Sequence, residues 1–345
     1  TSDAVGGDLD ELRLCFLPLS HIYARTCDLY SWVYHGSQLV LAENRDTILR
    51  DCRLSKPTAI NAVPYFYQKV HDRIQALECT DMESELHAAL GGNVRSCFCG
   101  GAALAPDVET WFAKHNHRIL CGYGLTETSP VVAASTKDAH RTGTVGRPIP
   151  GVEVRIAADG EVLVRGHNLM QGYYHDEEAT NNMIRDGWLH TGDLGAIDED
   201  GYLSIQGRKK EMIVLSTGKN VSPTRVEGLL AASPLVEQVA VFGDDRSHLV
   251  AIIVPCGEPL KSEIRKRRIL VWSRRGALRN RKVKAIYTEE IARRLANAAR
   301  EEQVHEFLLI DRGFSIEKGE VTPKFSLCRK VIEDRFQPEL DALYA

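Results

Sequence analysis

Long apolar runs are missing from this chain of 345 residues. No stretch approaches the roughly 18 apolar residues that a membrane-spanning helix needs. The first residues, TSDAVGGDLDEL, are acidic and Gly-rich and include no basic or apolar leader, so we expect no targeting segment. The sequence favours a cytoplasmic protein, with peripheral contact at a membrane left open.

Paired cysteines with the spacing of a zinc site are also absent. The nine cysteines are an odd number, and Cys97 and Cys99 lie close together in an apolar, strand-like run. This pattern favours reduced, buried thiols. A large charge of one sign is missing too, because 43 Lys and Arg face 47 Asp and Glu. The near balance predicts no nucleic-acid partner.

The first half of the chain alternates between apolar runs and amphipathic stretches. Pro64 opens one such stretch, since proline is tolerated in the first turn of a helix, and a second helix is expected over Val108–His115. The expected strands are Leu12–Leu19, Gln38–Ala42, Thr58–Val63, Val94–Cys99 and Arg118–Cys121. This alternation predicts an α/β fold whose helices cover a largely parallel sheet.

From about Gly151 the pattern becomes antiparallel. Two pairs of alternating runs are joined by Asp-Gly turns, at Asp159-Gly160 and Asp200-Gly201, which is typical of β-hairpins. A boundary is expected near Arg208–Lys210, where a basic cluster precedes a new strand.

Two domains are therefore expected. Residues 1–209 would combine α/β layers with a β-barrel-like antiparallel part, and residues 210–345 would form a smaller α+β domain. The smaller domain is expected to contain a helix near Tyr287–Arg300.

The segment richest in chemistry is CGYGLTETSP, residues Cys121–Pro130. Its glycines flank an aromatic ring, so the backbone can approach a flat ligand while Tyr123 stacks on it. Thr hydroxyls, which bond phosphate oxygens, and Glu127, a hard oxygen ligand for magnesium, follow at once. Taken alone, the segment also fits a plain Gly-rich strand and turn.

This segment resembles the adenine-and-phosphate motif of the adenylate-forming superfamily, which includes acyl-CoA synthetases, luciferases and peptide-synthetase adenylation domains. Three further segments resemble the family's motifs in the same order: Gly100–Ala103, Thr191–Gly195 and Gly207–Glu211. The resemblance covers nearly the whole chain. It implies a large domain of α/β layers with a distorted β-barrel, followed by a small mobile α+β domain.

The resemblance also implies a nucleotide site. Its expected members are Gly100, Gly101 and Ala102 beside the adenine, Tyr123, Gly124 and Thr126 in the adenine-and-phosphate motif, and Glu127 as the Mg2+ ligand, with Thr126 and Glu127 in the catalytic set. Asp193 would accept from the ribose hydroxyls, and Arg208 would bind the ribose or the α-phosphate. Taken alone, Asp193 also fits an ordinary aspartate in a turn, and Arg208 also fits one member of a solvated basic cluster. Lys210 corresponds to the pivot of a domain rotation.

Two segments are typical of one subfamily. LPLSHIYART, at Leu17–Thr26, is similar to the LPLSHxxER segment of long-chain fatty acyl-CoA synthetases, although Ala24 replaces the usual Glu. By this resemblance His21 borders the acyl and phosphate site, whereas a lone His in an apolar run is more often a core residue. The run Ser216–Pro223 would place Gly218 beside the pantetheine tunnel, and a plain strand–helix turn is the alternative.

Two departures from the family pattern concern activity. The family's phosphate loop, which ends in a Lys, normally precedes LPLSH, and no such stretch lies before Leu17. We therefore expect an N-terminally truncated chain that lacks part of the ATP site. In the tail EVTPKFSLCRK, Ser326 stands where the family has its catalytic lysine, and serine cannot supply the fixed positive charge that stabilises developing charge on the α-phosphate. Lys324, on the same face of a strand, is the candidate substitute.

The reaction that the resemblance implies has two steps. A long-chain fatty acid carboxylate attacks the α-phosphate of ATP and releases pyrophosphate, and the CoA thiolate then displaces AMP from the acyl-adenylate. The implied partners are ATP or AMP, a fatty acid and CoA, with Mg2+ as cofactor. The alternatives are a ligase for another carboxylic acid and a non-catalytic nucleotide-binding remnant.

One basic run stands apart from these motifs. From Lys261 to Lys284 the chain has eleven Lys and Arg against one acid, Glu263. A solvated face or mobile loop is the expected outcome for such a run. The phosphates of CoA and an anionic membrane surface are the alternatives.

Overall fold

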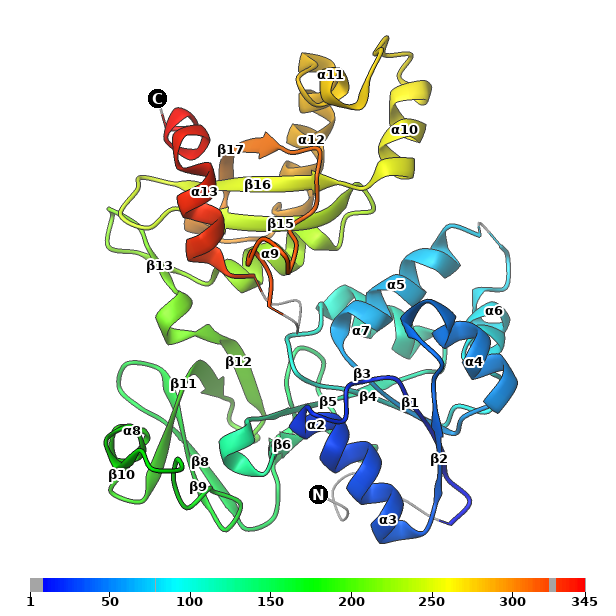
Figure 1. The fold of residues 1–345 in the computed structure, drawn as a ribbon, viewed down its shortest axis with the longest axis vertical. Coiled ribbons are helices and arrows are strands. Elements are labelled where there is room, and N and C mark those ends of the chain that lie inside the picture. The colour runs from blue at the N-terminus through cyan, green and yellow to red at the C-terminus, as the bar shows by residue number, and fades with distance from the viewer. Residues whose placement is uncertain (1–8, 78, 323–326, 345) are drawn as a thin grey trace. The chain divides into compact units, whose positions relative to one another are not determined.

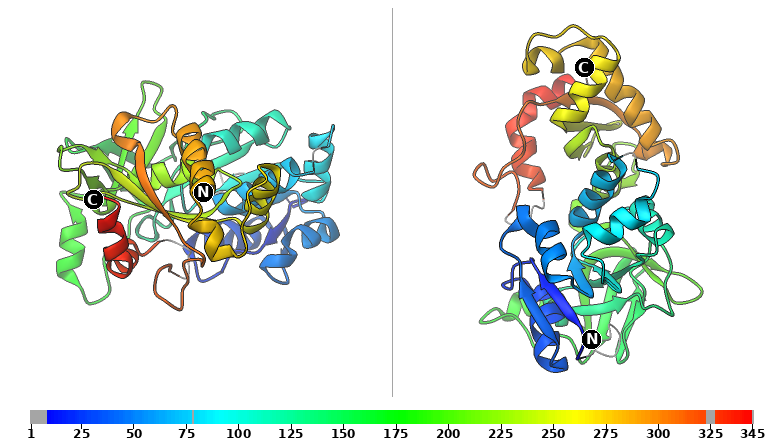
Figure 2. Two further views of the ribbon diagram at one scale, coloured as in Figure 1. Left: turned by 90° about the horizontal axis from the view of Figure 1, so that it is seen from above. Right: turned by 90° about the vertical axis from the view of Figure 1, so that its right-hand side faces the viewer.

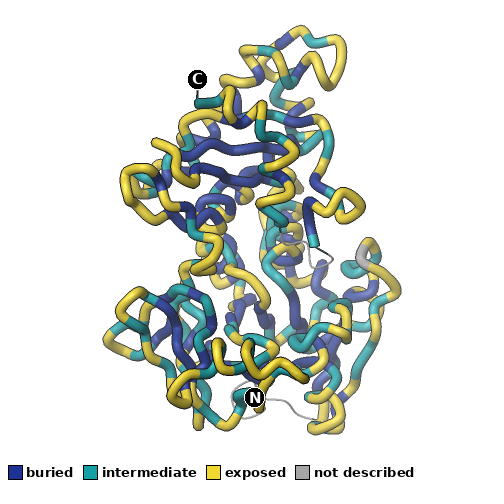
Figure 3. Tube along the Cα trace, turned by 60° about the vertical axis from the view of Figure 1, so that its left-hand side comes forward, coloured by how far each residue is buried: buried dark blue, intermediate teal, exposed yellow. Residues whose placement is uncertain are grey.

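A computed structural model describes residues 9–77, 79–322 and 327–344 of the chain (Figure 1). The chain divides into two compact units, Thr1–Lys209 and Lys210–Ala345, each with its own core. Figure 3 shows buried residues concentrated along the strands and exposed residues along the connecting loops.

The first unit contains a seven-stranded sheet in the order β2-β1-β3-β4-β5-β6-β7. Its members are β1 (Leu12–Cys15), β2 (Gln38–Leu41), β3 (Ala59–Ala62), β4 (Ser96–Cys99), β5 (Ile119–Gly124), β6 (Val131–Ala134) and β7 (Arg147–Pro148). The pairs among β1 to β5 are parallel, and β6 and β7 add antiparallel pairs. The expected α/β fold with a largely parallel sheet is therefore confirmed.

Helices cover both faces of this sheet, and its central strands β1, β3, β4 and the first half of β5 are accordingly buried. One face carries α4 (Ile48–Ser55), α5 (Pro64–Gln75), α6 (Met82–Ala89) and α7 (Pro106–Lys114), and the other carries α2 (Ile22–Ala24), the π-helical turn Arg25–Tyr30 and α3 (Ser31–His35) (Figures 1 and 2). As predicted, Pro64 is the first residue of its helix. Tyr67 and Phe112, both fully buried, pack edge to face between α5 and α7.

The first unit also contains a five-stranded antiparallel sheet. It comprises β8 (Val152–Ile156), β9 (Glu161–Gly166), β10 (Ile184–Arg185), β11 (Trp188–Ile197) and β12 (Leu203–Arg208), with α8 (Glu177–Met183) before β10. Both predicted hairpins are present, as the pairs β8–β9 and β11–β12. Val162 and Leu203 share a core with Val132 of β6, which joins this sheet to the first.

The second unit is built around three strands in the order β15-β16-β17. They are β15 (Val236–Phe242), β16 (Leu249–Pro255) and β17 (Val304–Leu309), preceded by the small hairpin β13 (Ile213–Val214) and β14 (Asn220–Val221). One face packs on α9 (Pro223–Ala231), α10 (Gly257–Lys266) and α12 (Arg281–Arg294), and the other on α13 (Arg329–Ala342). The short helix α11 (Arg274–Leu278) precedes α12.

Two sequence-based predictions need correction. The helix expected over Tyr287–Arg300 is wrong in its bounds, because Asn280 caps α12 by accepting from the Lys282 N–H at 2.8 Å, and the helix ends at Arg294. The strand expected to end at Cys121 continues as β5 to Gly124, so the Gly-Tyr-Gly motif belongs to a strand.

Among the described residues, no helix is long and apolar enough to span a bilayer. The nine cysteines are all free thiols, and six of them are buried.

Candidate functional site

The motif residues of the first unit meet at one edge of its parallel sheet. Gly100 and Gly101 follow β4 directly, and Gly124 ends β5, the parallel neighbour of β4. Because the carboxyl ends of parallel strands share one edge, the two motifs lie side by side there. This is the edge at which open α/β sheets bind their ligands.

The glycine of the first motif allows an aromatic ring to come close. A Cβ at Gly100 would lie 3.2 Å from Cζ of Tyr23, a residue of the LPLSHIYART segment. Burial raises the pKa of the Tyr23 phenol, and its hydroxyl has no hydrogen-bond partner in the described structure. The structure therefore joins the N-terminal segment to the Gly100 turn through Tyr23, a contact that the sequence analysis did not predict.

His21 lies at the start of that helical segment. Its Nδ1 accepts a hydrogen bond from the backbone N–H of Tyr23 at 3.2 Å, so His21 caps α2. A ring nitrogen that accepts a backbone N–H carries no proton. In this structure His21 is thus a half-buried capping residue.

The loop after β5 is fixed by its own backbone. A Cβ at Gly124 would lie 1.7 Å from the carbonyl oxygen of Pro130, so only glycine fits there. Thr128 is fully buried, and its hydroxyl donates to the Pro130 carbonyl at 2.6 Å. Asn168, which the sequence analysis missed, donates its amide to the carbonyls of Thr128 and Val131, both at 2.9 Å.

The two threonines of the motif therefore have different roles. The Thr128 hydroxyl donates to a carbonyl of the loop itself. Thr126, in contrast, is exposed, and its hydroxyl makes no hydrogen bond with any described residue. Thr126 is available to a phosphate oxygen. Glu127 beside it is half-buried, and its Oε1 accepts from the Tyr173 hydroxyl at 2.9 Å. Burial, reinforced by this carboxylate, raises the pKa of Tyr173 to about 12, so the phenol remains a donor.

Glu127 fits a magnesium ion that a nucleotide brings with it. Such an ion needs only one or two protein carboxylates, because phosphate oxygens and water complete its coordination. The second oxygen of Glu127 has no hydrogen bond in the described part of the chain. Among the described residues, no group of three or more His, Cys, Asp or Glu side chains could hold a metal ion by itself.

A second cluster joins the two sheets of the first unit. Asp193, on β11, is almost fully buried; its Oδ2 accepts from the Tyr123 hydroxyl at 2.6 Å and its Oδ1 lies 2.8 Å from Nε of Arg208. Asp193 and Arg208 face each other across the β11–β12 pair. Burial and the neighbouring Asp193 carboxylate raise the pKa of Tyr123, so its hydroxyl stays protonated and donates.

Backbone contacts hold this aspartate in place. Its N–H donates to the Thr191 hydroxyl at 3.0 Å, and that hydroxyl donates to the Val162 carbonyl at 2.7 Å. The neighbouring Gly192 N–H donates to Glu161 at 2.9 Å. The chain therefore presents a buried carboxylate between an aromatic hydroxyl and a half-exposed guanidinium, an arrangement that suits a pair of vicinal hydroxyls.

Ala102, which follows Gly101 in the first unit, is exposed, and the remaining predicted residues belong to the second unit. Lys210 is the middle residue of a 3-10 turn, Lys209–Glu211, and Gly218, at φ +76°, lies in the turn between β13 and β14. The positive φ explains why that turn has a glycine. Lys324 and Ser326 lie outside the described residues.

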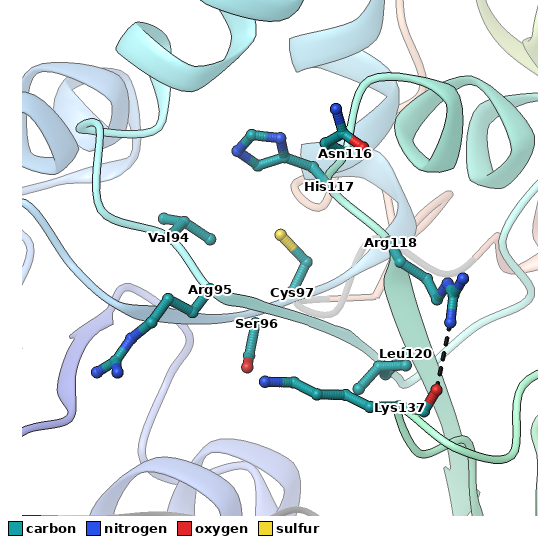
Figure 4. Close-up of a pocket in the computed structure, with 9 residues that line it drawn as sticks. All are labelled: Val94, Arg95, Ser96, Cys97, Asn116, His117, Arg118, Leu120 and Lys137. Atoms are coloured by element: carbon teal, nitrogen blue, oxygen red, sulfur yellow. Dashed lines mark hydrogen bonds between the residues drawn. The ribbon is translucent and has the colours of Figure 1, made fainter.

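A pocket of about 340 Å³ lies at the other end of the same strands (Figure 4). Its lining includes Ser96, where β4 begins, and Arg118, just before β5. Since the motifs follow the carboxyl ends of β4 and β5, this pocket is separate from the candidate site.

Comparison with known proteins identifies the family of the chain. Residues 2–174 match the AMP-binding enzyme family, and residues 210–345 match the AMP-binding enzyme C-terminal domain. The long-chain-fatty-acid–CoA ligase FadD15 of Mycobacterium tuberculosis is 34% identical over 376 residues, which cover 97% of this chain and 62% of that protein. The human long-chain-fatty-acid–CoA ligase ACSBG1 is 27% identical, with 97% and 55% covered. The chain thus spans about three-fifths of the length of these relatives.

Solved structures show the same fold. The adenylation domain of a carboxylate reductase from Mycobacterium chelonae matches with a TM-score of 0.80 at 21% identity, over 97% of this chain and 54% of that one. The corresponding domain from Segniliparus rugosus, in complex with AMP and a co-purified carboxylic acid, matches with a TM-score of 0.79 at 23% identity and the same coverage. With its two parts matched in order, the chain belongs to the AMP-binding, adenylate-forming enzyme family, as its motifs predicted.

Proposed function

We propose that this chain carries the nucleotide site of a ligase that activates a long-chain fatty acid with ATP and transfers it to CoA. The observation that carries the proposal is the cluster of Tyr123, Asp193 and Arg208 next to the Gly124–Glu127 loop. The names of the FadD15 and ACSBG1 relatives support a long-chain fatty acid as the substrate.

In this proposal the ribose lies against Asp193. Its two hydroxyls would donate to the two carboxylate oxygens, and Arg208 would stay paired with the carboxylate through Nε while the exposed part of its guanidinium reaches the α-phosphate. Gly100, Gly101 and Ala102 would let the adenine approach the backbone, with Tyr123 against its face.

The phosphate groups lie at the open end of the loop. The Thr126 hydroxyl would donate to an α-phosphate oxygen, and Glu127, oriented by Tyr173, would bind the magnesium that accompanies ATP. When bound, that ion neutralises charge on the phosphates. Tyr173 donates to only one oxygen of Glu127, so the other remains available.

The chemistry follows in two displacements. A fatty acid carboxylate oxygen attacks the α-phosphorus, the bond to the β-phosphate oxygen breaks, and pyrophosphate leaves. The CoA thiolate then attacks the acyl carbonyl carbon, and AMP leaves with the electron pair of the broken C–O bond. Charge on the α-phosphate must be offset in the first step, which Arg208 would do, with Lys324 as the substitute for the lysine that Ser326 replaces.

The second unit would take part through two residues. Lys210 would be the pivot whose φ and ψ change between the two steps, and Gly218 would border the pantetheine path. His21 of the first unit would lie near the acyl group. These three assignments rest on the family resemblance.

A release assay tests the proposal on the chain as it stands. The purified 345-residue protein is given ATP, Mg2+ and saturated fatty acids from short to long, and pyrophosphate is measured. The proposal expects release above background, greatest with the long acids and lost in Asp193→Asn. A folded chain that binds AMP but releases no pyrophosphate with any acid would instead support a non-catalytic remnant, which Ser326 in the lysine position favours.

A further inference from the structure

The basic run of the second unit is helical. It covers most of α10, all of α11 and the start of α12, and the connection Arg267–Ser273 joins α10 to α11 (Figure 1). Figures 1 and 2 show α10 and α11 projecting beyond the three-stranded sheet of their own unit. All eleven Lys and Arg of Lys261–Lys284 are exposed. We call Arg267–Ser273 the basic connection.

The basic connection has a fixed inner side and an apolar outer side. Ile269 is buried in the core of the unit, and Val271 packs against that core. The residues that alternate with them, Leu270 and Trp272, are 86% and 99% exposed. Because Ile269 and Val271 anchor the segment, its alternation directs Leu270 and Trp272 outward together. Two adjacent large apolar side chains held in water indicate a binding surface.

The cations of the run Lys261–Lys284, which contains the basic connection, are only partly neutralised. Six of the eleven make no ion pair with any carboxylate of the described residues: Arg265, Arg268, Arg274, Arg279, Arg281 and Lys282. No Asp or Glu occurs between Glu263 and Glu289. The apolar tip therefore lies in a region of net positive charge.

We infer that the basic connection docks the second unit on an anionic membrane surface. In this arrangement Trp272 and Leu270 enter the headgroup layer, where an indole ring and an aliphatic side chain are both favoured. The unpaired cations contact the lipid phosphates, each contributing about fivefold in affinity near an anionic surface.

This partner accounts for both parts of the surface. The phosphates of a small nucleotide would engage cations and its base would stack on Trp272, but Leu270 would remain in water. A single-stranded nucleic acid would stack on Trp272 but has no comparable use for an adjacent aliphatic side chain. Docking needs no nucleotide and no fatty acid, so it is independent of the proposed ligase activity.

The test measures sedimentation of the full chain with vesicles, without ATP or fatty acid. One set is phosphatidylcholine alone, and the other contains about 30% phosphatidylserine. We expect binding to the anionic set that weakens steeply with added salt. The double variant Leu270→Ser/Trp272→Ser should bind at least tenfold more weakly. Tyr174→Ser, which removes an equally exposed aromatic of the first unit, should bind like the parent.

A charge variant and a fluorescence variant sharpen the assignment. Arg265→Gln/Arg279→Gln/Lys282→Gln should lose about 100-fold in affinity at low salt, by about fivefold for each cation. The matched triple Arg53→Gln/Arg73→Gln/Lys114→Gln, on exposed helix positions of the first unit, should lose far less. Trp272→Phe should keep its binding but lose the vesicle-dependent change in tryptophan emission.

Circular dichroism must first show that each variant is folded. Equal binding to both vesicle types, or unchanged binding of the folded double variant, would overturn the inference. So would a Trp272-dependent affinity for single-stranded nucleic acid in a chain that ignores vesicles, which would identify the other class of partner.

Discussion

The two ends of the candidate nucleotide site differ in how many of their hydrogen bonds are already made. At the ribose end, both oxygens of Asp193 are engaged, by the Tyr123 hydroxyl and by Arg208. At the phosphate end, the Thr126 hydroxyl and one oxygen of Glu127 make no hydrogen bond with the described residues. In the proposed site, one end is therefore assembled before a ligand arrives, and the other would be completed by the ligand.

This difference assigns different tasks to the two ends. A pre-assembled carboxylate loses little entropy on binding, although ribose hydroxyls must replace or share its present donors. The open end offers a hydroxyl and a carboxylate to a charged group that brings its own metal. We therefore expect the ribose end to control affinity for any adenosine nucleotide, and the phosphate end to control the response to Mg2+ and to phosphate number.

The largest expected effect comes from the loop that separates the two ends. Gly124→Ala would place a Cβ 1.7 Å from the Pro130 carbonyl oxygen, so the loop must move. We expect the free energy of unfolding to fall by more than about 3 kcal/mol, and nucleotide binding to be lost. Gly122→Ala in the same strand is the control, since its Cβ would lie 3.6 Å from the nearest atom. Equal melting temperatures for the two variants would contradict the account.

The next effect concerns the pre-assembled end. Asp193→Asn keeps the shape but removes the charge that both partners and the ribose use. AMP affinity should fall about 10- to 100-fold, as expected for hydrogen bonds to a charged group. Isothermal titration measures it, with Asp200→Asn, an exposed aspartate at the turn of the same hairpin, as the control. An affinity unchanged within twofold would remove Asp193 from the ribose site.

A smaller and more selective effect is expected at the open end. Glu127→Gln should lower the affinity for ATP in the presence of Mg2+ about tenfold, because a neutral amide is a poor ligand for this ion. Removal of Mg2+ with a chelator should erase the difference between the parent and the variant, and AMP binding should stay unchanged. Glu177→Gln, in α8, controls for the loss of one charge. A variant that keeps its full response to Mg2+ would exclude Glu127 as the metal ligand.

The smallest effect comes from the residue that orients Glu127. Tyr173→Phe removes one hydrogen bond, worth about 0.5–1.5 kcal/mol, so affinity for ATP with Mg2+ should fall about two- to tenfold. AMP affinity should not change. The neighbouring Tyr174 is 90% exposed, and Tyr174→Phe should match the parent. Equal losses of AMP and ATP binding in Tyr173→Phe would mean that it acts through the fold.

Much of this fold could be predicted because its signals are local. Asp-Gly turns between alternating runs located both hairpins, and Pro64 marked the first residue of α5. The helices of the basic run were missed, because dense charge masks the few apolar positions, such as Leu260 in α10 and Val283 in α12, that face the core.

In the candidate site, too, local pairs could be predicted from the sequence and contacts between distant segments could not. One of its pairs could have been found by counting outward from the turn at Asp200-Gly201, which places Asp193 opposite Arg208. A longer turn shifts the pairs near it by one residue, and a bulge after Leu194 restores the count. The contacts of Tyr173 with Glu127 and of Asn168 with Thr128 span 46 and 40 residues, and no local pattern predicts them.

The measurement that tests the account most directly compares two ligands on two variants by isothermal titration. Adenosine carries only the groups that the ribose end would bind, and ATP with Mg2+ adds those of the phosphate end. The account predicts that Asp193→Asn weakens both ligands by a similar factor, while Glu127→Gln weakens only ATP with Mg2+. If both variants weakened both ligands equally, or if Glu127→Gln weakened adenosine, the division of the site into a ribose end and a phosphate end would be contradicted.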